Sequence, residues 1–459
     1  MAAPSAFRTT STTEEGVAAV QAQPVPVQAL RLLPATQLLG PTEGSGLREP
    51  PCYIRRSDDQ VIQLSPLLFE FARAARPGTS EAEIAERAGA ALDARVTTEQ
   101  VRYVLEKKLY PLGVVAGPDG SEPELARLDP LLGVHLRVGA IRPATMNTIG
   151  RSLAPLFQPV VVACMLLAFV AVDVWLFALH GIGNSINSVI DQPTVGLLLL
   201  LILYASMVFH ECGHAAACRY SGGRCGGMGM GLFIVWPALF TDVTESYRFD
   251  RRGRLRTDLG GIYFNGIYAL AIAAAYALTG WEPLLLAVVA QHFQIFSQFL
   301  PWMRLDGYYV VADLIGVPDL FARVRPVLRS LIPGRGSDPR VVELKPWARY
   351  AVTGWVLTAM VAVNAFLIVM VLSSPVYISR AWTSLFTEAG TVAAAASAGR
   401  VLDVVGACVG AVLLVLPVVG MTIIYLQVCR RLGTGLAVFR TRPLLAAAQA
   451  AAREASRAA

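Results

Sequence analysis

The chain of 459 residues carries little charge, since only 16% of its residues are Asp, Glu, Lys or Arg. Soluble globular proteins contain about 25% charged residues, so this composition is atypical of a soluble protein. Apolar residues make up 54% of the sequence. The low charge and high apolar content together predict a membrane protein.

Paired cysteines and a hydrophobic N-terminus are also absent. The seven cysteines are dispersed without a CxxC pair, which predicts free thiols, and we interpret Cys212 and Cys225 as small buried hydrophobes. The opening "MAAPSAFRTTSTTEEG" lacks the apolar core of a cleavable signal. We therefore expect the first apolar span to direct membrane insertion.

Long apolar segments are present, and the length of each is close to the roughly 20 residues that a spanning helix needs. The six predicted spans cover residues 155–179, 194–217, 258–279, 283–301, 349–373 and 403–426. The sequence thus predicts a mainly α, polytopic fold with about six transmembrane helices.

Basic residues alternate between the connections of these spans. Cys218–Arg256 and Gly316–Arg349 each contain seven Lys or Arg, whereas Gly181–Pro193 contains none. By the positive-inside rule, the basic connections and both termini are expected to be cytoplasmic. This topology and anionic headgroups explain the net charge of +6 better than a nucleic-acid partner does.

Outside the spans, the chain divides by composition. We expect a flexible arm over residues 1–50, a small globular module over 51–116, a connector over 117–150 and a cytoplasmic tail over 433–459.

The module is predicted to be α+β and winged-helix-like. Ser80 with Glu83, and Thr97 with Gln100, have the spacing of capping boxes that begin two helices. A winged helix could bind DNA, but residues 51–116 contain nine basic and nine acidic residues. Because a DNA reader needs a basic face, we expect no nucleic-acid partner.

The most informative motif is His210-Glu211-Cys212-Gly213-His214, which fits H-E-x-x-H. Positions i and i+4 lie on one face of a helix, so both imidazoles can bind one Zn²⁺ ion. Zinc takes four ligands, and a catalytic site leaves one position for water. The sequence should therefore supply a third ligand.

Asp306 is the predicted third ligand. His135 precedes the membrane, His180 ends the first span on the far side, and His292 lies deep in the fourth span. The second and fourth spans run in the same direction, so Asp306 is expected to emerge near the same leaflet as His214. With zinc activating a water molecule, Glu211 would act as the general base.

A polar stripe of Gln291, Gln294 and Gln298 follows one face of the fourth span. It fits either a wet cavity beside the metal or hydrogen bonds between helices.

The segments "FHECGHAAACRY", "LGGIYFNGIY" and "LPWMRLDGYY" together resemble the site-2 protease family of zinc intramembrane metallopeptidases, and most of all its bacterial peptide-maturation and export branch. The resemblance covers residues 194–316 and implies a peptidase domain over 151–432. It implies that His210, His214 and Asp306 bind zinc, with Glu211 as the catalytic acid and base. It also implies that Asn265 contacts the substrate beside the metal.

The chain departs from this family at two places. Gly261-Ile262 stands where Gly-Pro often precedes the Asn of the third span, which is the smaller change. Leu300-Pro301 stands where Asn-Pro often precedes the LDG motif, which removes a side-chain donor near Asp306.

The "VIQLSP" strand, the two capped helices and the "LYPLGVV" ending resemble the PqqD-like peptide-recognition modules. That resemblance implies a leader peptide bound as an added strand to residues 51–116. The resemblance to the site-2 protease family also implies that residues 227–249 form a small membrane-embedded β-hairpin whose edge pairs with an extended substrate, and a re-entrant packing loop is the alternative interpretation of this segment.

The sequence therefore predicts a multi-pass enzyme of the bacterial cytoplasmic membrane that cuts a peptide or membrane-segment substrate at the cytoplasmic leaflet. Partners would be the substrate, the lipid bilayer and peptide-modification or export machinery. Two alternatives stay open, namely regulated proteolysis of a membrane-tethered regulator and a non-proteolytic peptide-export component.

Overall fold

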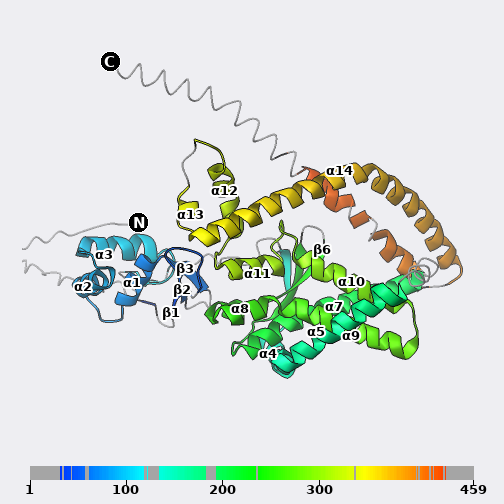
Figure 1. Cartoon of the computed structure of the whole chain (residues 1–459), viewed down its shortest axis with the longest axis horizontal. Helices are drawn as coiled ribbons and strands as arrows, with labels where there is room; N and C mark the ends of the chain where they lie inside the picture. The colour runs from blue at the N-terminus through cyan, green and yellow to red at the C-terminus, as the bar shows by residue number, and fades with distance from the viewer. Residues whose placement is uncertain are drawn as a thin grey trace, which may run out of the picture. The chain divides into compact units, whose positions relative to one another are not determined.

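A computed structural model of the chain describes residues 32–430 with gaps. The residues left out within that range are 34–35, 43, 57–60, 118–120, 122, 124–133, 182–192, 234–235, 335–337, 400, 402–403, 413–414, 417 and 427–429. The chain separates into two compact units (Figure 1). The first comprises Met1–Gln37, Arg56–Asp58 and Leu67–Ala126, and the second comprises the remainder.

The first unit contains short helices with well-defined starts. They are α1 (Pro66–Ala74), α2 (Glu81–Leu92), α3 (Thr98–Val104) and the π-helical turn η1 (Leu105–Leu109). Both predicted capping boxes form. The Ser80 and Thr97 hydroxyls each accept a hydrogen bond from the backbone N–H of the third residue of their helix, and their own backbone N–H groups donate to the side chain of that residue. These four hydrogen bonds satisfy backbone groups that a helix start otherwise exposes.

A small sheet of order β1-β2-β3 belongs to the second unit, apart from its first residue. Its strands are β1 (Gln37–Pro41), β2 (Cys52–Arg55) and β3 (Val61–Leu64), and β2 pairs antiparallel with β3. The boundary between the units thus passes through the module predicted for residues 51–116. Residues 36–42 and 44–50 of the predicted flexible arm are ordered in the structure.

Four described helices are long and apolar enough to cross a membrane. The segments are Pro159–His180, Val195–Tyr220, Gly260–Thr279 and Pro346–Ala394. They belong to α5 (Pro159–Val174) with its π-helical end η3 (Trp175–His180), α7 (Pro193–Tyr220), α9 (Gly260–Thr279) and α14 (Pro346–Ser397). These helices support a membrane protein.

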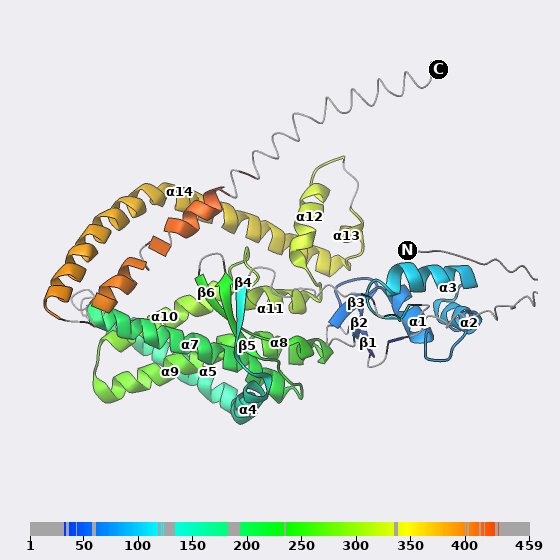
Figure 2. The ribbon, with the colours of Figure 1, turned by 180° about the vertical axis from the view of Figure 1, so that it is seen from behind.

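The fourth predicted span differs from expectation. Helix α10 (Pro283–Gln298) has only 16 residues, because the chain leaves the helix at Phe299, two residues before Pro301. It packs against both α9 and α7 (Figure 2). The predicted sixth span, 403–426, is described as helix only in pieces, 404–412 and 418–426 among them.

A second sheet, of order β4-β5-β6, lies beside α7 (Figure 2). Its strands β5 (Met228–Phe233) and β6 (Trp236–Thr241) pair antiparallel, and β4 (Val134–Ile141) adds to the other edge of β5. Strand β4 lies inside the segment predicted to be a connector, so this connector contributes to the fold.

The remaining elements connect these parts of the second unit. They are α4 (Pro143–Leu153), η2 (Ala154–Phe157), η4 (Thr244–Arg248), α8 (Arg251–Asp258), α11 (Asp306–Ile315), η5 (Leu320–Arg323), α12 (Val324–Ser330) and α13 (Pro339–Val342).

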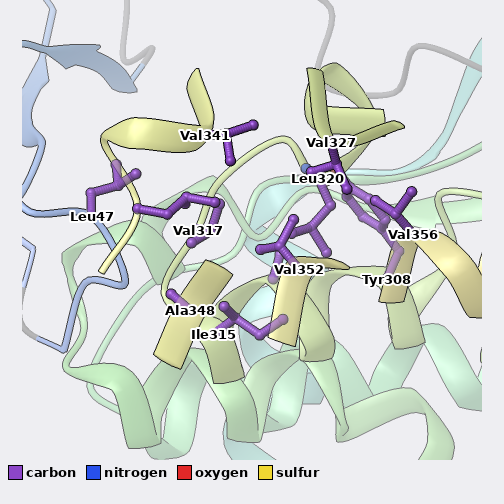
Figure 3. Packing of buried hydrophobic residues seen from close by; sticks show 12 residues of the cluster. Leu47, Tyr308, Ile315, Val317, Leu320, Val327, Val341, Ala348, Val352 and Val356 are labelled. Atoms are coloured by element: carbon purple, nitrogen blue, oxygen red, sulfur yellow. The ribbon is translucent and has the colours of Figure 1, made fainter. Parts of the chain in front are cut away.

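One apolar core joins α11, α12, α13 and the start of α14 (Figure 3). Leu320, Val327, Val352 and Val356 are completely buried in it. Leu47 of the N-terminal arm enters the same core and forms a β-bridge with Leu344. The arm is therefore fixed to the segment that leads into α14.

Candidate metal centre

Helix α7 carries the H-E-x-x-H motif near its C-terminal end. His210, Glu211 and His214 are each only 8% exposed. Their ligand atoms lie within 4.8 Å of one another. Such a concentration of buried ionisable groups in an apolar helix needs compensation by a charge or a metal.

Asp306 is the first residue of α11 and meets the two imidazoles. Its Oδ2 atom lies 3.0 Å from His210 Nε2 and 3.2 Å from His214 Nε2. The two Nε2 atoms are 3.3 Å apart. Ligands at about 2.0–2.1 Å from a tetrahedral zinc ion lie roughly 3.3–3.4 Å from one another. The three atoms therefore have nearly the separations that one zinc ion would impose.

The hydrogen bond at His214 Nδ1 also fits a metal ion bound at Nε2. Its Nδ1 atom lies 2.8 Å from the Thr257 carbonyl oxygen, which can only accept, so Nδ1 carries the proton. In the neutral ring, Nε2 then presents a lone pair toward Asp306. The buried Oδ2 atom of Asp306 receives no hydrogen bond within the described chain. A nitrogen lone pair facing a carboxylate oxygen fits a shared Zn²⁺ ion.

Glycines allow α9 to approach α7 at this point. A Cβ atom at Gly213 would lie 2.3 Å from the Gly260 carbonyl oxygen. A Cβ atom at Gly261 would lie 2.4 Å from His210 Nε2. The His210 ring is therefore held against a surface that only glycine provides.

We expect Gly261→Ala to weaken zinc binding about 10- to 100-fold, because the added methyl group displaces the His210 ring. Zinc content after dialysis of the purified protein measures the effect. Gly266→Ala is the matched control on the same helix, since its Cβ would have only an ordinary contact of 3.7 Å with Phe169. Equal zinc retention by both variants would show that the close approach does not position His210.

Glu211 is placed beside the three-atom cluster and close to a strand edge. The Thr241 hydroxyl at the end of β6 donates to the Glu211 backbone carbonyl, 3.2 Å away. Strand β6 is an edge of the described sheet. The Glu211 backbone is thus tied to the end of β6, and a carboxylate oxygen of Glu211 lies within 4.8 Å of the ligand atoms of His210 and His214.

Asn265 lies one helical turn after Gly261 on α9. It is 1% exposed, and neither its amide nitrogen nor its amide oxygen has a hydrogen-bond partner among the described residues. Such buried, unsatisfied amides are uncommon in folded proteins. A substrate or water contact would satisfy this group.

The glutamines of the polar stripe differ in their contacts. Gln294 accepts a hydrogen bond from Ser206 of α7 at 2.9 Å, which supports the interhelical interpretation. Gln291 is fully buried, and neither of its amide atoms has a described partner, which fits internal water. Both interpretations thus have an observation in their favour.

A buried ion pair connects α11 to α8, and therefore Asp306 to Thr257. The Arg254 Nε atom lies 3.0 Å from Asp313 Oδ2, and Arg254 is 5% exposed. Asp258 lies in α8, outside the four apolar helices, and hydrogen-bonds to Asp313. Burial and the nearby Asp313 charge raise the pKa of Asp258 well above its usual value, so this carboxyl group stays protonated above that value.

This raised pKa predicts a loss of stability with increasing pH. Above about pH 4 the unfolded chain releases the Asp258 proton first, so unfolding becomes easier until the folded-state pKa is passed. Asp258→Asn retains an N–H donor for Asp313 and should remove this slope, so the variant should be more stable than the wild-type protein at neutral pH. Thermal unfolding of the zinc-free protein at a series of pH values measures how its stability changes with pH. An unchanged slope, equal to that of the exposed-site variant Asp93→Asn, would contradict the prediction.

Other polar residues of the spans lie apart from this cluster. His292 Nε2 pairs with Asp173 Oδ1 of α5 at 3.0 Å, so His292 is engaged elsewhere. Cys212 and Cys225 are buried in an apolar cluster with Phe264. The residues that sequence reasoning missed are Thr257 and Gly261. The repeated small residues at 213, 260 and 261 were the available signal for close helix packing.

Comparison with known proteins gives one distant relative. The chain is 22% identical over 159 residues to the "putative peptide zinc metalloprotease protein YydH" of Bacillus subtilis (strain 168). The alignment covers 34% of this chain and 63% of that protein, which is less than two thirds of its length. No family model matches the chain, and no solved structure matches it.

Proposed function

We propose that this chain is a membrane-embedded zinc metalloendopeptidase of the site-2 protease type. The observation that carries the proposal is the cluster of His210 Nε2, His214 Nε2 and Asp306 Oδ2, with all separations between 3.0 and 3.3 Å. The similarity to a protein named as a peptide zinc metalloprotease supports the same chemistry.

Each residue has a distinct role in this proposal. His210, His214 and Asp306 would hold the metal, and the Thr257 carbonyl would fix the His214 ring through Nδ1. When bound there, zinc would lower the pKa of a water molecule to roughly 7 and polarise the substrate carbonyl. Glu211 would take the proton of the attacking water and deliver it to the leaving amine. Asn265 would donate a hydrogen bond to the developing oxyanion.

The substrate would be an extended peptide segment held on the free edge of β6. Pairing with a strand exposes the peptide bond that a helical substrate hides, and Thr241 of β6 already contacts the Glu211 backbone. We place the reaction at the cytoplasmic leaflet, in peptide maturation or export, with both termini in the cytoplasm.

Residues 51–116 would deliver the substrate. A leader peptide bound there would raise the local concentration of the attached segment at the peptidase site. Binding of a labelled leader peptide and of a labelled DNA duplex to the full-length protein tests this role. Preferential binding of the duplex would contradict it.

Metal dependence tests the central proposal. Purified protein in detergent is incubated with an unstructured peptide library, and mass spectrometry identifies the cleaved bonds. We expect cleavage to stop when a chelator removes zinc and to return when zinc is restored. Cleavage that continues in fully zinc-free protein would contradict a metallopeptidase.

A further inference from the structure

A second site lies on the same unit, away from the metal cluster. A cleft of about 730 Å³ opens between α12, α13, α14 and the Pro301–Trp302 turn. The helices that form its walls are packed together, because Val327, Val341 and Val356 of these helices belong to one apolar core (Figure 3). The volume is in the range of small-molecule and lipid-headgroup sites.

One wall of the cleft is strongly cationic. Arg325, Arg329 and Arg340 line it, against a single carboxylate, Asp338. Arg325 and Arg329 are exposed and lie four residues apart on α12, so they project from one face. The neighbouring Arg323 and Arg304 are ion-paired with Glu343 and Asp319, whereas no described carboxylate pairs with Arg325 or Arg329.

The opposite wall is apolar and belongs to α14. Ala359, Met360 and Val363 line the cleft there. Trp302 stacks on Phe366 of the same helix, with ring centroids 5.2 Å apart. Tryptophan favours the boundary between headgroups and acyl chains, so this wall has the chemistry of a membrane interface.

The exposure pattern of α14 places this boundary at the cleft. With 52 residues, α14 is more than twice as long as the roughly 20 residues that cross a bilayer, so part of it must lie outside lipid. Before the cleft, its exposed side chains include Arg349 and Tyr350. From the cleft onward they are mostly apolar over several turns, apart from Asn364 and Ser373, and the large apolar side chains Val361 (71%), Val369 (63%) and Leu372 (73%) are strongly exposed.

We propose that this cleft binds one anionic phospholipid, with the phosphate held by Arg325, Arg329 and Arg340 and an acyl chain lying along α14. Guanidinium groups bind phosphate through paired hydrogen bonds, and basic pockets next to spanning helices attract anionic headgroups. The apolar wall favours a lipid over free phosphate, which would leave that wall uncovered. This inference does not depend on the peptidase activity.

Lipid titration of the purified full-length protein tests the proposal. Phosphatidylglycerol and phosphatidylcholine with identical acyl chains are added in detergent, and native mass spectrometry counts the bound molecules. We expect one saturable phosphatidylglycerol site. The double variant Arg325→Gln/Arg329→Gln should bind it roughly tenfold or more weakly, since each arginine near a headgroup contributes to binding.

The matched control is Arg151→Gln/Arg252→Gln, which removes the same charge from exposed positions outside the cleft. It should bind phosphatidylglycerol as the wild-type protein does. Equal midpoints of thermal unfolding in all proteins show that each variant is folded. A brominated phosphatidylglycerol chain should quench Trp302 fluorescence, and this quenching should be absent in Trp302→Phe.

Four results would overturn the proposal. They are equal binding of both lipids, undiminished binding by the folded Arg325→Gln/Arg329→Gln variant, displacement of the lipid by inorganic phosphate at equal concentration, and binding of an acidic peptide in place of lipid.

Discussion

Glu211→Gln is expected to reduce peptide cleavage by roughly 10²- to 10⁴-fold while leaving zinc content unchanged. The carboxamide has almost the same shape as the carboxylate but cannot accept the proton of the attacking water. None of the three atoms that would hold the metal is altered, so the metal cluster should stay intact. Initial rates of peptide cleavage and zinc analysis of the same samples measure the two effects.

Glu86→Gln provides the control, because it makes the same chemical change at an exposed position of α2. It should cleave at the wild-type rate. If Glu211→Gln also processed substrate normally, the metallopeptidase assignment would be lost. The non-proteolytic peptide-export alternative would then be favoured.

Asp306→Asn is expected to weaken zinc binding by at least about 100-fold. Loss of a group that merely supports a ligand typically costs 10- to 100-fold in metal affinity, and Asp306 would be a direct and charged ligand. Its Oδ2 atom lies within 3.2 Å of both imidazole nitrogens, so the substitution removes the carboxylate charge from the centre of the cluster. Competition with a zinc-sensitive dye measures the dissociation constant.

Asp93→Asn is the matched control for this substitution. Asp93 is an exposed residue at the end of α2 with a φ of 49°, a conformation that asparagine tolerates well. It should bind zinc with the wild-type affinity. If Asp306→Asn did the same, another group would complete the coordination sphere and the proposed ligand set would be wrong.

Features set by short-range patterns were accessible from the sequence. The capping boxes of α2 and α3 form as predicted, since each depends on residues three positions apart. The approach of Asp306 to the H-E-x-x-H motif followed from helix direction and membrane depth, and the structure places these atoms within 3.3 Å. Their roles as metal ligands remain a prediction.

Features set by distances between helices were not accessible. The contact of Gly261 with His210 depends on how closely α7 and α9 approach, which residue spacing does not specify. Strand β4 was missed because its partner β5 lies about 90 residues further along the chain. Helix α10 was predicted too long because apolar residues continue beyond the point where its helical backbone ends at Gln298.

The docked N-terminal arm sets an order for biosynthesis. Ser45 accepts a hydrogen bond from Lys345, 300 residues later, and Leu47 bridges to Leu344. At about 5–20 residues per second, the ribosome needs roughly 15–60 s to make the intervening chain. Three of the four apolar helices, α5, α7 and α9, are synthesised in that interval. The arm therefore has no partner for this contact until the segment before α14 has been made. This contact can therefore form only late in synthesis, after His210, His214 and Asp306 have all been made.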